Sequence, residues 1–163
     1  MFSVGDIVCY PMHGVGTIQS IEEKTILGDT ASYYIIRFVS NNMTAMVPVN
    51  NVEQVGLRNV IDADECDKVF KYLDGEATDE SDNWNQRYRD NMDKLKRGSI
   101  YEIADVVKSL KKRETEKGLS SVERKMFISA KNVLITELSY ASGKTVSDIE
   151  MCFDSLCQKQ TNN

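Results

Sequence analysis

Few side chains in this 163-residue sequence could support catalysis, and they are scattered along it. The single histidine, His13, lies in a Pro/Gly-rich turn, and Cys9 is the only nucleophile near it in the sequence. A catalytic triad would have to use this one histidine, and a structural turn residue is the simpler interpretation. No Walker-type phosphate loop is present, and Gly14-Val15-Gly16 lacks the third glycine of a dinucleotide fingerprint. The sequence therefore predicts a protein that is not an enzyme.

Metal and disulfide chemistry are not predicted either. A zinc site needs clustered ligands with spacing such as C-x2-C, whereas the four cysteines are spread over the chain: Cys9, Cys66, Cys152 and Cys157. The last two are five positions apart, which separates them by about 140° around a helix. We expect core thiols, with no metal and no cofactor, in the reducing environment of the cytosol.

The single tryptophan lies among the residues best suited to binding a ligand. Trp84 is followed by Arg87, Tyr88 and Arg89, and the spacing of three places Arg87 on the same face of a helix. An aromatic ring flanked by cations can stack on an exposed base while the cations hold phosphates. The alternative is a tryptophan in a helical core, or one that packs against Tyr88 where the helix begins. These residues alone leave both interpretations open.

The net charge of −5 conceals an uneven distribution. Residues 1–80 contain 5 basic and 13 acidic side chains, whereas residues 87–131 contain 13 basic and 7 acidic ones. This division favours two partners, a protein for the first half and phosphates for the second. Charged helices with solvated faces would give the same composition, so the charge alone does not decide.

The composition, 41% hydrophobic and 28% charged, is that of an ordinary globular protein. No apolar stretch reaches the roughly 18 residues that a membrane span needs. The first residues, Met1–Asp6, carry neither the basic nor the apolar segment of a secretion signal. We therefore expect a cytoplasmic protein that contacts no membrane and takes no small-molecule substrate.

The elements that would position these side chains change character near residue 62. Before it, short strands are predicted over residues 6–10, 17–22, 33–39, 43–48 and 52–55, separated by Gly and Asn turns. Short strands in so few residues predict a small antiparallel barrel. The strand over 43–48 could also add to the sheet of a partner if it lies at an edge.

After residue 62 the apolar residues recur with a helical period. We expect a short helix over 63–73, an acidic linker over 76–82, and four helices that begin near Asp82, Ser99, Ser120 and Thr145. Ser99 with Glu102, and Ser120 with Glu123, have the spacing of a capping box. The predicted fold class is α+β, a small antiparallel β-barrel followed by an all-α helical domain.

The sequence contains two groups of short motifs, one in each half of the chain. The chain opens with Val4-Gly5-Asp6-x-Val8-x-Tyr10-Pro11-x-His13-Gly14-Val15-Gly16 and continues with Val47-Pro48 and Val55-Gly56-Leu57-Arg58. Its second half contains Asn83-Trp84-x-x-Arg87-Tyr88, Ala104-Asp105-Val106-Val107-x-x-Leu110 and Lys117-Gly118-Leu119-Ser120. Together these motifs resemble the CarD/CdnL family of bacterial transcription regulators. The first group is shared with the RNA-polymerase-interacting domain of transcription-repair coupling factor.

The resemblance implies three segments. Residues 1–61 would form a Tudor-like (SH3-like) barrel that binds the protrusion lobe of the RNA polymerase β subunit. Residues 62–82 would form a short helix and acidic linker, and residues 83–160 a helical domain that contacts promoter DNA. In the family, a tryptophan wedges into the minor groove at the upstream edge of the transcription bubble and stabilises the open complex. That tryptophan corresponds to Trp84.

The resemblance also implies particular contacts. The family's basic DNA contacts fall on Arg89 and Arg124, while a third family arginine is replaced by Gln86, beside which Arg87 remains a DNA-binding candidate. On the polymerase side, Lys24 keeps one basic residue of the family, whereas Met46 replaces the other. Because Met46 cannot pair with a carboxylate, we expect docking that is either more apolar or weaker than in the family. A minor-groove wedge needs no base-edge contacts, so we expect weak sequence specificity.

A different class of function remains as the alternative. In it, the chain is a protein-interaction adaptor whose barrel binds a partner, whose helices are only a scaffold, and which binds no DNA. Trp84 would then lie in the helical core, so the exposure of this side chain distinguishes the two interpretations.

Overall fold

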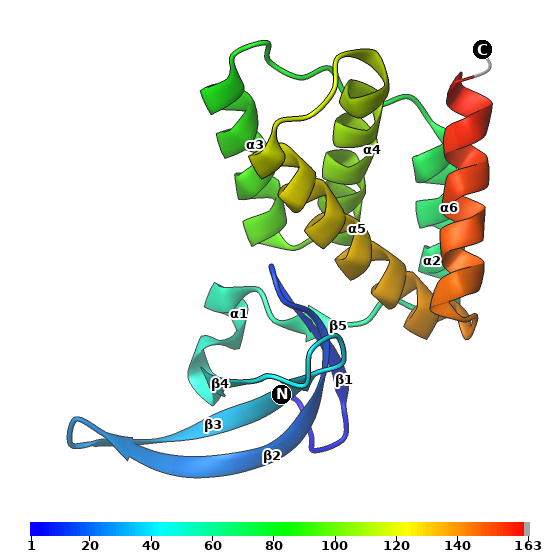
Figure 1. Ribbon diagram of the computed structural model, residues 1–163. Helices are drawn as coiled ribbons and strands as arrows, with labels where there is room; N and C mark the ends of the chain where they lie inside the picture. Colours follow the sequence, from blue (N-terminus) through cyan, green and yellow to red (C-terminus); the bar gives the residue numbers. More distant parts are fainter. Residues whose placement is uncertain (162–163) are drawn as a thin grey trace. The chain divides into compact units, whose positions relative to one another are not determined.

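The computed structural model describes residues 1–161, with side chains described as far as residue 156, so the side chain of Cys157 lies outside the described residues. The chain divides into two compact units, one comprising Met1–Val60 and the other beginning at Ile61. The first contains the strands and the second the long helices (Figure 1). The predicted α+β class, an antiparallel sheet followed by an all-α domain, is confirmed.

The first unit, the β domain, is an antiparallel sheet with strand order β4-β3-β2-β1-β5. Its strands are β1 (Ile7–Tyr10), β2 (Gly14–Ile26), β3 (Asp29–Phe38), β4 (Thr44–Pro48) and β5 (Arg58–Asn59). Its core consists of apolar side chains from the strands together with Leu57, which directly precedes β5: Val8, Ile18, Tyr34, Ile36, Phe38, Val47 and Leu57. Because β4 and β5 terminate the strand order, they are the two edges of the sheet.

The fifth strand is not where the sequence predicted it. Residues 52–55 form the short helix α1 (Val52–Val55) after a 3-10 turn, η1 (Val49–Asn51), and the strand that follows is β5. Val49, Val52 and Val55 all pack on the β core. Their spacing of three is helical and does not match the period of two in a strand.

The β2–β3 hairpin is longer than predicted. Its strands pair from Gly16 with Phe38 out to Ile26 with Asp29. Beyond Ser20 the residues of β2 are exposed, so this outer half is held by backbone pairing and cross-strand contacts, such as the one between Thr25 and Thr30, more than by burial. The hairpin therefore presents its outer half to solvent.

The second unit, the helical domain, comprises α2 (Ala63–Asp74), α3 (Trp84–Arg97), α4 (Ile100–Glu116), α5 (Ser121–Ser142) and α6 (Val146–Thr161). Its largest helix contact is between α4 and α5, and α2, α3 and α6 pack around this pair (Figure 1). The core includes Val69 from α2, Leu110 from α4, Leu134 from α5 and Ile149 from α6, all of them fully buried. None of the helices in residues 1–161 is long and apolar enough to span a membrane.

The two predicted capping boxes have different outcomes. At α5 the box is present, with the Ser120 side chain accepting from the Glu123 N–H and the Glu123 side chain accepting from the Ser120 N–H. At α4 it is wrong, because Ser99 makes no side-chain cap hydrogen bond. Glu102 instead accepts a hydrogen bond from Arg97 Nε at 2.6 Å. An ionised partner on the preceding helix outcompetes a neutral backbone amide for this carboxylate.

Residues 62–82, expected to form a short helix and an acidic linker, belong to the second compact unit. The helix α2 packs on α4 and α5, so it is part of the helical domain. The acidic segment after it also contacts this domain: Ser109 Oγ donates to the Thr78 carbonyl, and Asn91 Nδ2 donates to Glu80. We call residues 78–82 the acidic segment below.

Candidate nucleic-acid interface and docking strand

Trp84 is the first residue of α3 and is held there by a side-chain cap. Asn83, the N-cap, accepts a hydrogen bond from the Gln86 N–H at 3.1 Å. Trp84 is 41% exposed. Trp84 is therefore not the core residue that the adaptor interpretation required.

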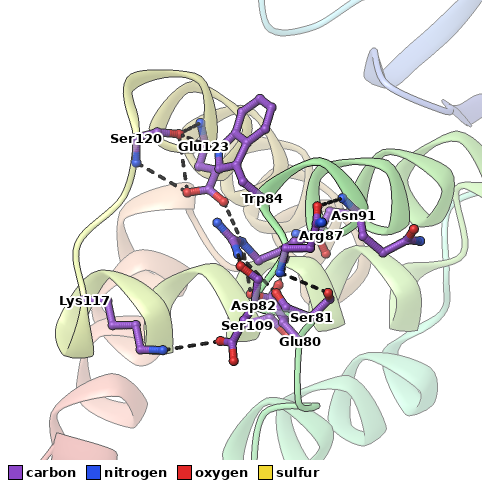
Figure 2. A network of polar contacts seen from close by, with 12 residues as sticks. Glu80, Ser81, Asp82, Trp84, Arg87, Asn91, Ser109, Lys117, Ser120 and Glu123 are labelled. Atoms are coloured by element: carbon purple, nitrogen blue, oxygen red, sulfur yellow. Dashed lines mark hydrogen bonds and ion pairs between the residues drawn. The ribbon is translucent and has the colours of Figure 1, made fainter.

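Two contacts fix the orientation of the indole. Its Nε1–H donates to Ser120 Oγ at 3.3 Å (Figure 2). Its ring also stacks on that of Tyr88, with centroids 5.4 Å apart and planes 11° from parallel. Ser120 is the N-cap of α5, so these contacts bring together the N-terminal ends of α3 and α5. One face of the indole is covered and the opposite face has no aromatic partner among the described residues.

Arg87 lies in the interior of the helical domain, and the prediction that it contacts DNA is corrected. The side chain is only 3% exposed. Its Nε donates to Glu123 Oε1 at 2.7 Å, and its Nη1 donates to the carbonyls of Ser81 and Asp82 (Figure 2). Oε2 of Glu80 also lies 4.0 Å from Arg87 Nε. A guanidinium enclosed in this way holds α3, α5 and the acidic segment together and does not reach a phosphate.

Glu123 completes this arrangement from α5. It is 2% exposed, and one of its oxygens accepts from Arg87 while the other lies within reach of the Ser120 N–H and hydroxyl. The same carboxylate therefore neutralises the buried Arg87 and caps the N-terminal end of α5. Loss of either partner would leave an uncompensated charge in the interior, which proteins tolerate poorly.

Arg89 and Arg124 are the predicted DNA-binding cations that remain exposed. Arg89 makes one long hydrogen bond, to the Asn85 carbonyl at 3.4 Å, and lies about 140° around α3 from Trp84. Arg124 follows Glu123 in the first turn of α5 and pairs with Glu114 at 3.8 Å. Exposed ion pairs of this kind are worth less than about 1 kcal/mol, so Arg124 can exchange Glu114 for a phosphate.

Other cations of the basic stretch are occupied within the domain. Lys108 is buried: it donates to the Tyr72 carbonyl at 2.8 Å and lies 4.5 Å from the centre of the Tyr72 ring, and burial lowers its pKa. The hydrogen bond from Tyr72 to Asp105 raises the pKa of Tyr72 to about 12.

Lys112 and Lys117 pair with Asp79 and Asp82 of the acidic segment. Sequence counting therefore overestimated the free positive charge of this region. Among the described residues, no group of three or more potential ligands could hold a metal ion.

In the β domain, the two predicted polymerase-binding residues lie on the same face of the sheet. Met46 is opposite Ile35 and Lys24 is opposite Ala31, and Ile35 and Ala31 are an even number of residues apart on β3. Met46 is 46% exposed on the edge strand β4, and Lys24 pairs only loosely with Glu22, at 3.9 Å. The outer face of the hairpin and the edge strand thus form one continuous surface.

Sequence reasoning did not identify Ser120 and Glu123 as partners of Trp84 and Arg87. The capping box marked both residues as a helix start, but nothing in a capping box indicates which distant side chain approaches it. Tyr88 had a visible signal, because aromatic residues at i and i+4 meet on a helix surface.

A β domain with β4 at one edge of its sheet, followed by a helical domain that exposes one fixed tryptophan, defines a class of two-part interaction proteins. Comparison with known families specifies the class. Residues 2–61 match the CarD-like/TRCF RID domain, and residues 68–154 match the C-terminal domain of CarD. The chain belongs to the CarD family of transcription regulators, which is not a class of enzymes, and its N-terminal part is the RNA-polymerase-interacting domain of that family.

A relative that matches most of the chain agrees with this assignment. The chain is 39% identical over 150 residues to a Bacillus subtilis (strain 168) protein named "Putative transcription factor YdeB", covering 92% of this chain and 98% of that protein. Two solved N-terminal domains from Myxococcus xanthus are also similar. One, of CdnL, is 41% identical and covers 37% of this chain and 86% of its own; the other, of CarD, is 30% identical and covers 36% and 79%. Both have TM-scores of 0.32.

Substitution of either member of the buried pair will destabilise the helical domain. We expect Arg87→Ala and Glu123→Ala to lower the free energy of unfolding by about 3–5 kcal/mol, because each leaves a buried charge without its partner. Urea denaturation followed by circular dichroism measures the change. Arg89→Ala, on the exposed side of the same helix, is the matched control and should change stability by less than about 0.5 kcal/mol. An Arg87→Ala protein as stable as the control would contradict the structural role of the pair.

Proposed function

We propose that this chain binds the RNA polymerase β subunit through its β domain and stabilises the promoter open complex through Trp84. The observation that carries the proposal is the fixed, half-exposed indole at the joined ends of α3 and α5. A core residue would be buried, whereas this indole keeps an exposed surface in a held orientation, and an exposed aromatic ring can stack on a base. Binding to the polymerase would place this activity on the nucleoid in the cytoplasm.

The edge strand β4 supports the proposed docking on the protrusion lobe. An edge strand offers unpaired backbone groups to which a strand of a partner can add. Val47 points into the core of the β domain while Met46 points outward, so strand addition would leave Met46 and Lys24 to contact the partner's side chains. An apolar Met46 in place of a cation favours packing over ion pairing at this position.

The proposed mechanism requires little affinity for free DNA. Docking on the polymerase raises the local concentration of the helical domain near the upstream edge of the bubble. The exposed face of Trp84 then enters the minor groove and stacks on an unstacked base step, which opposes reclosure of the duplex. Arg89 and Arg124 contact the neighbouring phosphates, so recognition depends on the distorted backbone more than on base sequence.

The docking surface can be tested with the full-length chain. We expect Met46→Asp and Lys24→Glu to weaken capture of core RNA polymerase from a bacterial lysate, because both place a negative charge on the proposed contact face. Ile128→Asp, a similar change at an exposed apolar position on α5, is the control and should capture the polymerase normally. Equal capture by the wild-type protein and all three variants would show that this face is not the docking surface.

The phosphate contacts can be tested by charge reversal. We expect Arg89→Glu and Arg124→Glu to fold normally and to weaken the effect on promoter complexes, since exposed substitutions change stability by less than about 0.5 kcal/mol. Each lost contact should also reduce the salt dependence of the effect by about one unit of slope. Gln86→Glu, at an exposed position that already lacks the family's arginine, serves as the comparison. Full activity and an unchanged salt slope in both arginine variants would remove them from the interface.

Removal of the indole tests the mechanism directly. We expect Trp84→Ala to leave polymerase capture unchanged and to shorten the lifetime of the open complex about five- to a hundredfold, since stacking on a base is worth roughly 1–3 kcal/mol. Decay of the complex after addition of a competitor is the measurement. Trp84→Phe, which keeps a smaller stacking face, should recover part of the lifetime. A wild-type lifetime with Trp84→Ala would refute the proposed wedge.

A further inference from the structure

The contacts that hold Trp84 come from residues that are themselves fixed. Tyr88 is only partly exposed and packs against the core of the helical domain, so the ring under the indole cannot move freely. The Ser120 hydroxyl is held by its role at the start of α5, where it accepts from the Glu123 N–H at 3.2 Å. The indole therefore rests on two anchors from two different helices.

An exposed tryptophan without such anchors would exchange among its rotamers in the free protein. Entry into a base step would then require the loss of that freedom, which weakens binding. An indole already held in one orientation avoids this loss, and preorganisation of this kind strengthens binding without any new contact. The anchors also cover one face and the nitrogen edge, so only the opposite face is presented to a base.

We propose that Tyr88 and Ser120 are positioning residues that preorganise the Trp84 indole for insertion between bases. The inference rests on the proposed function, since it concerns how that wedge is held. Neither residue needs to touch DNA. Tyr88 supplies the stacking platform through its i, i+4 relation to Trp84 on α3, and Ser120 supplies the hydrogen-bond acceptor from α5.

The test uses the full chain, in which Trp84 is the only tryptophan and is therefore a direct spectroscopic probe. Time-resolved fluorescence anisotropy of the free protein measures the local motion of the indole. Tyr88→Leu should release the indole and lower the residual anisotropy, whereas Tyr88→Phe keeps an aromatic platform and should retain it. The same variants should shorten the open-complex lifetime about two- to tenfold for Leu and leave it near wild type for Phe.

Ser120 provides a second pair of variants that does not depend on the core packing of Tyr88. Glycine is an acceptable N-cap but cannot accept from the indole, so Ser120→Gly should release the indole while α5 still forms. Ser120→Thr keeps the hydroxyl and should behave as wild type. Tyr140→Leu, at an exposed tyrosine elsewhere on α5, controls for the loss of an aromatic ring and should change neither measurement.

The outcomes separate the inference from the function on which it rests. Unchanged anisotropy in both Tyr88→Leu and Ser120→Gly would overturn the inference, and so would a freer indole that leaves the open-complex lifetime unchanged while Trp84→Ala shortens it. An unaltered lifetime with Trp84→Ala would overturn the proposed function and the inference with it. Lower anisotropy and a shorter lifetime, both restored by Tyr88→Phe and Ser120→Thr, would support the inference.

Discussion

The buried ion pair between Arg87 and Glu123 is the interaction on which the proposed interface depends. It joins α3 to α5 at their N-terminal ends, and Arg87 extends it to the backbone of the acidic segment. Because neither charge reaches solvent, the pair is held by geometry and hydrogen bonding and is little affected by salt. The position of Ser120 against the indole of Trp84 follows from this junction, since the capping box that fixes Ser120 contains Glu123.

The acidic segment neutralises part of the positive charge of the helical domain. Asp79 and Asp82 pair with Lys112 and Lys117, and Glu80 lies near Arg87, so much of the positive charge of this region is neutralised internally. We therefore expect such a surface to bind free DNA weakly. This fits a protein that we propose to reach promoter DNA through polymerase docking and to retain only a few exposed arginines for the contact itself.

Local sequence determined most of the secondary structure. Turn residues and period-two alternation gave four of the five strands, and glycines with capping residues gave the helices to within a few positions, because these signals arise from neighbours along the chain. The prediction of a strand at residues 52–55 is wrong because Val52 and Val55 continue the helical spacing of three that begins at Val49. The order and spacing of the motifs were sufficient to identify the family.

Tertiary structure decided which charged residues are available to a partner. In sequence, Arg87 and Arg89 are equivalent cations beside a tryptophan; in the structure one is buried on Glu123 and the other is exposed, because the helix turns them to different sides. The same holds for Lys108, which is buried over Tyr72, and for residues 62–82, which belong to the helical domain. The cause is that the partners are distant in the sequence. Glu123 is 36 residues from Arg87, and Tyr72 is 36 residues from Lys108. Such a partner leaves no local sequence pattern, because the two residues meet only when the helices pack.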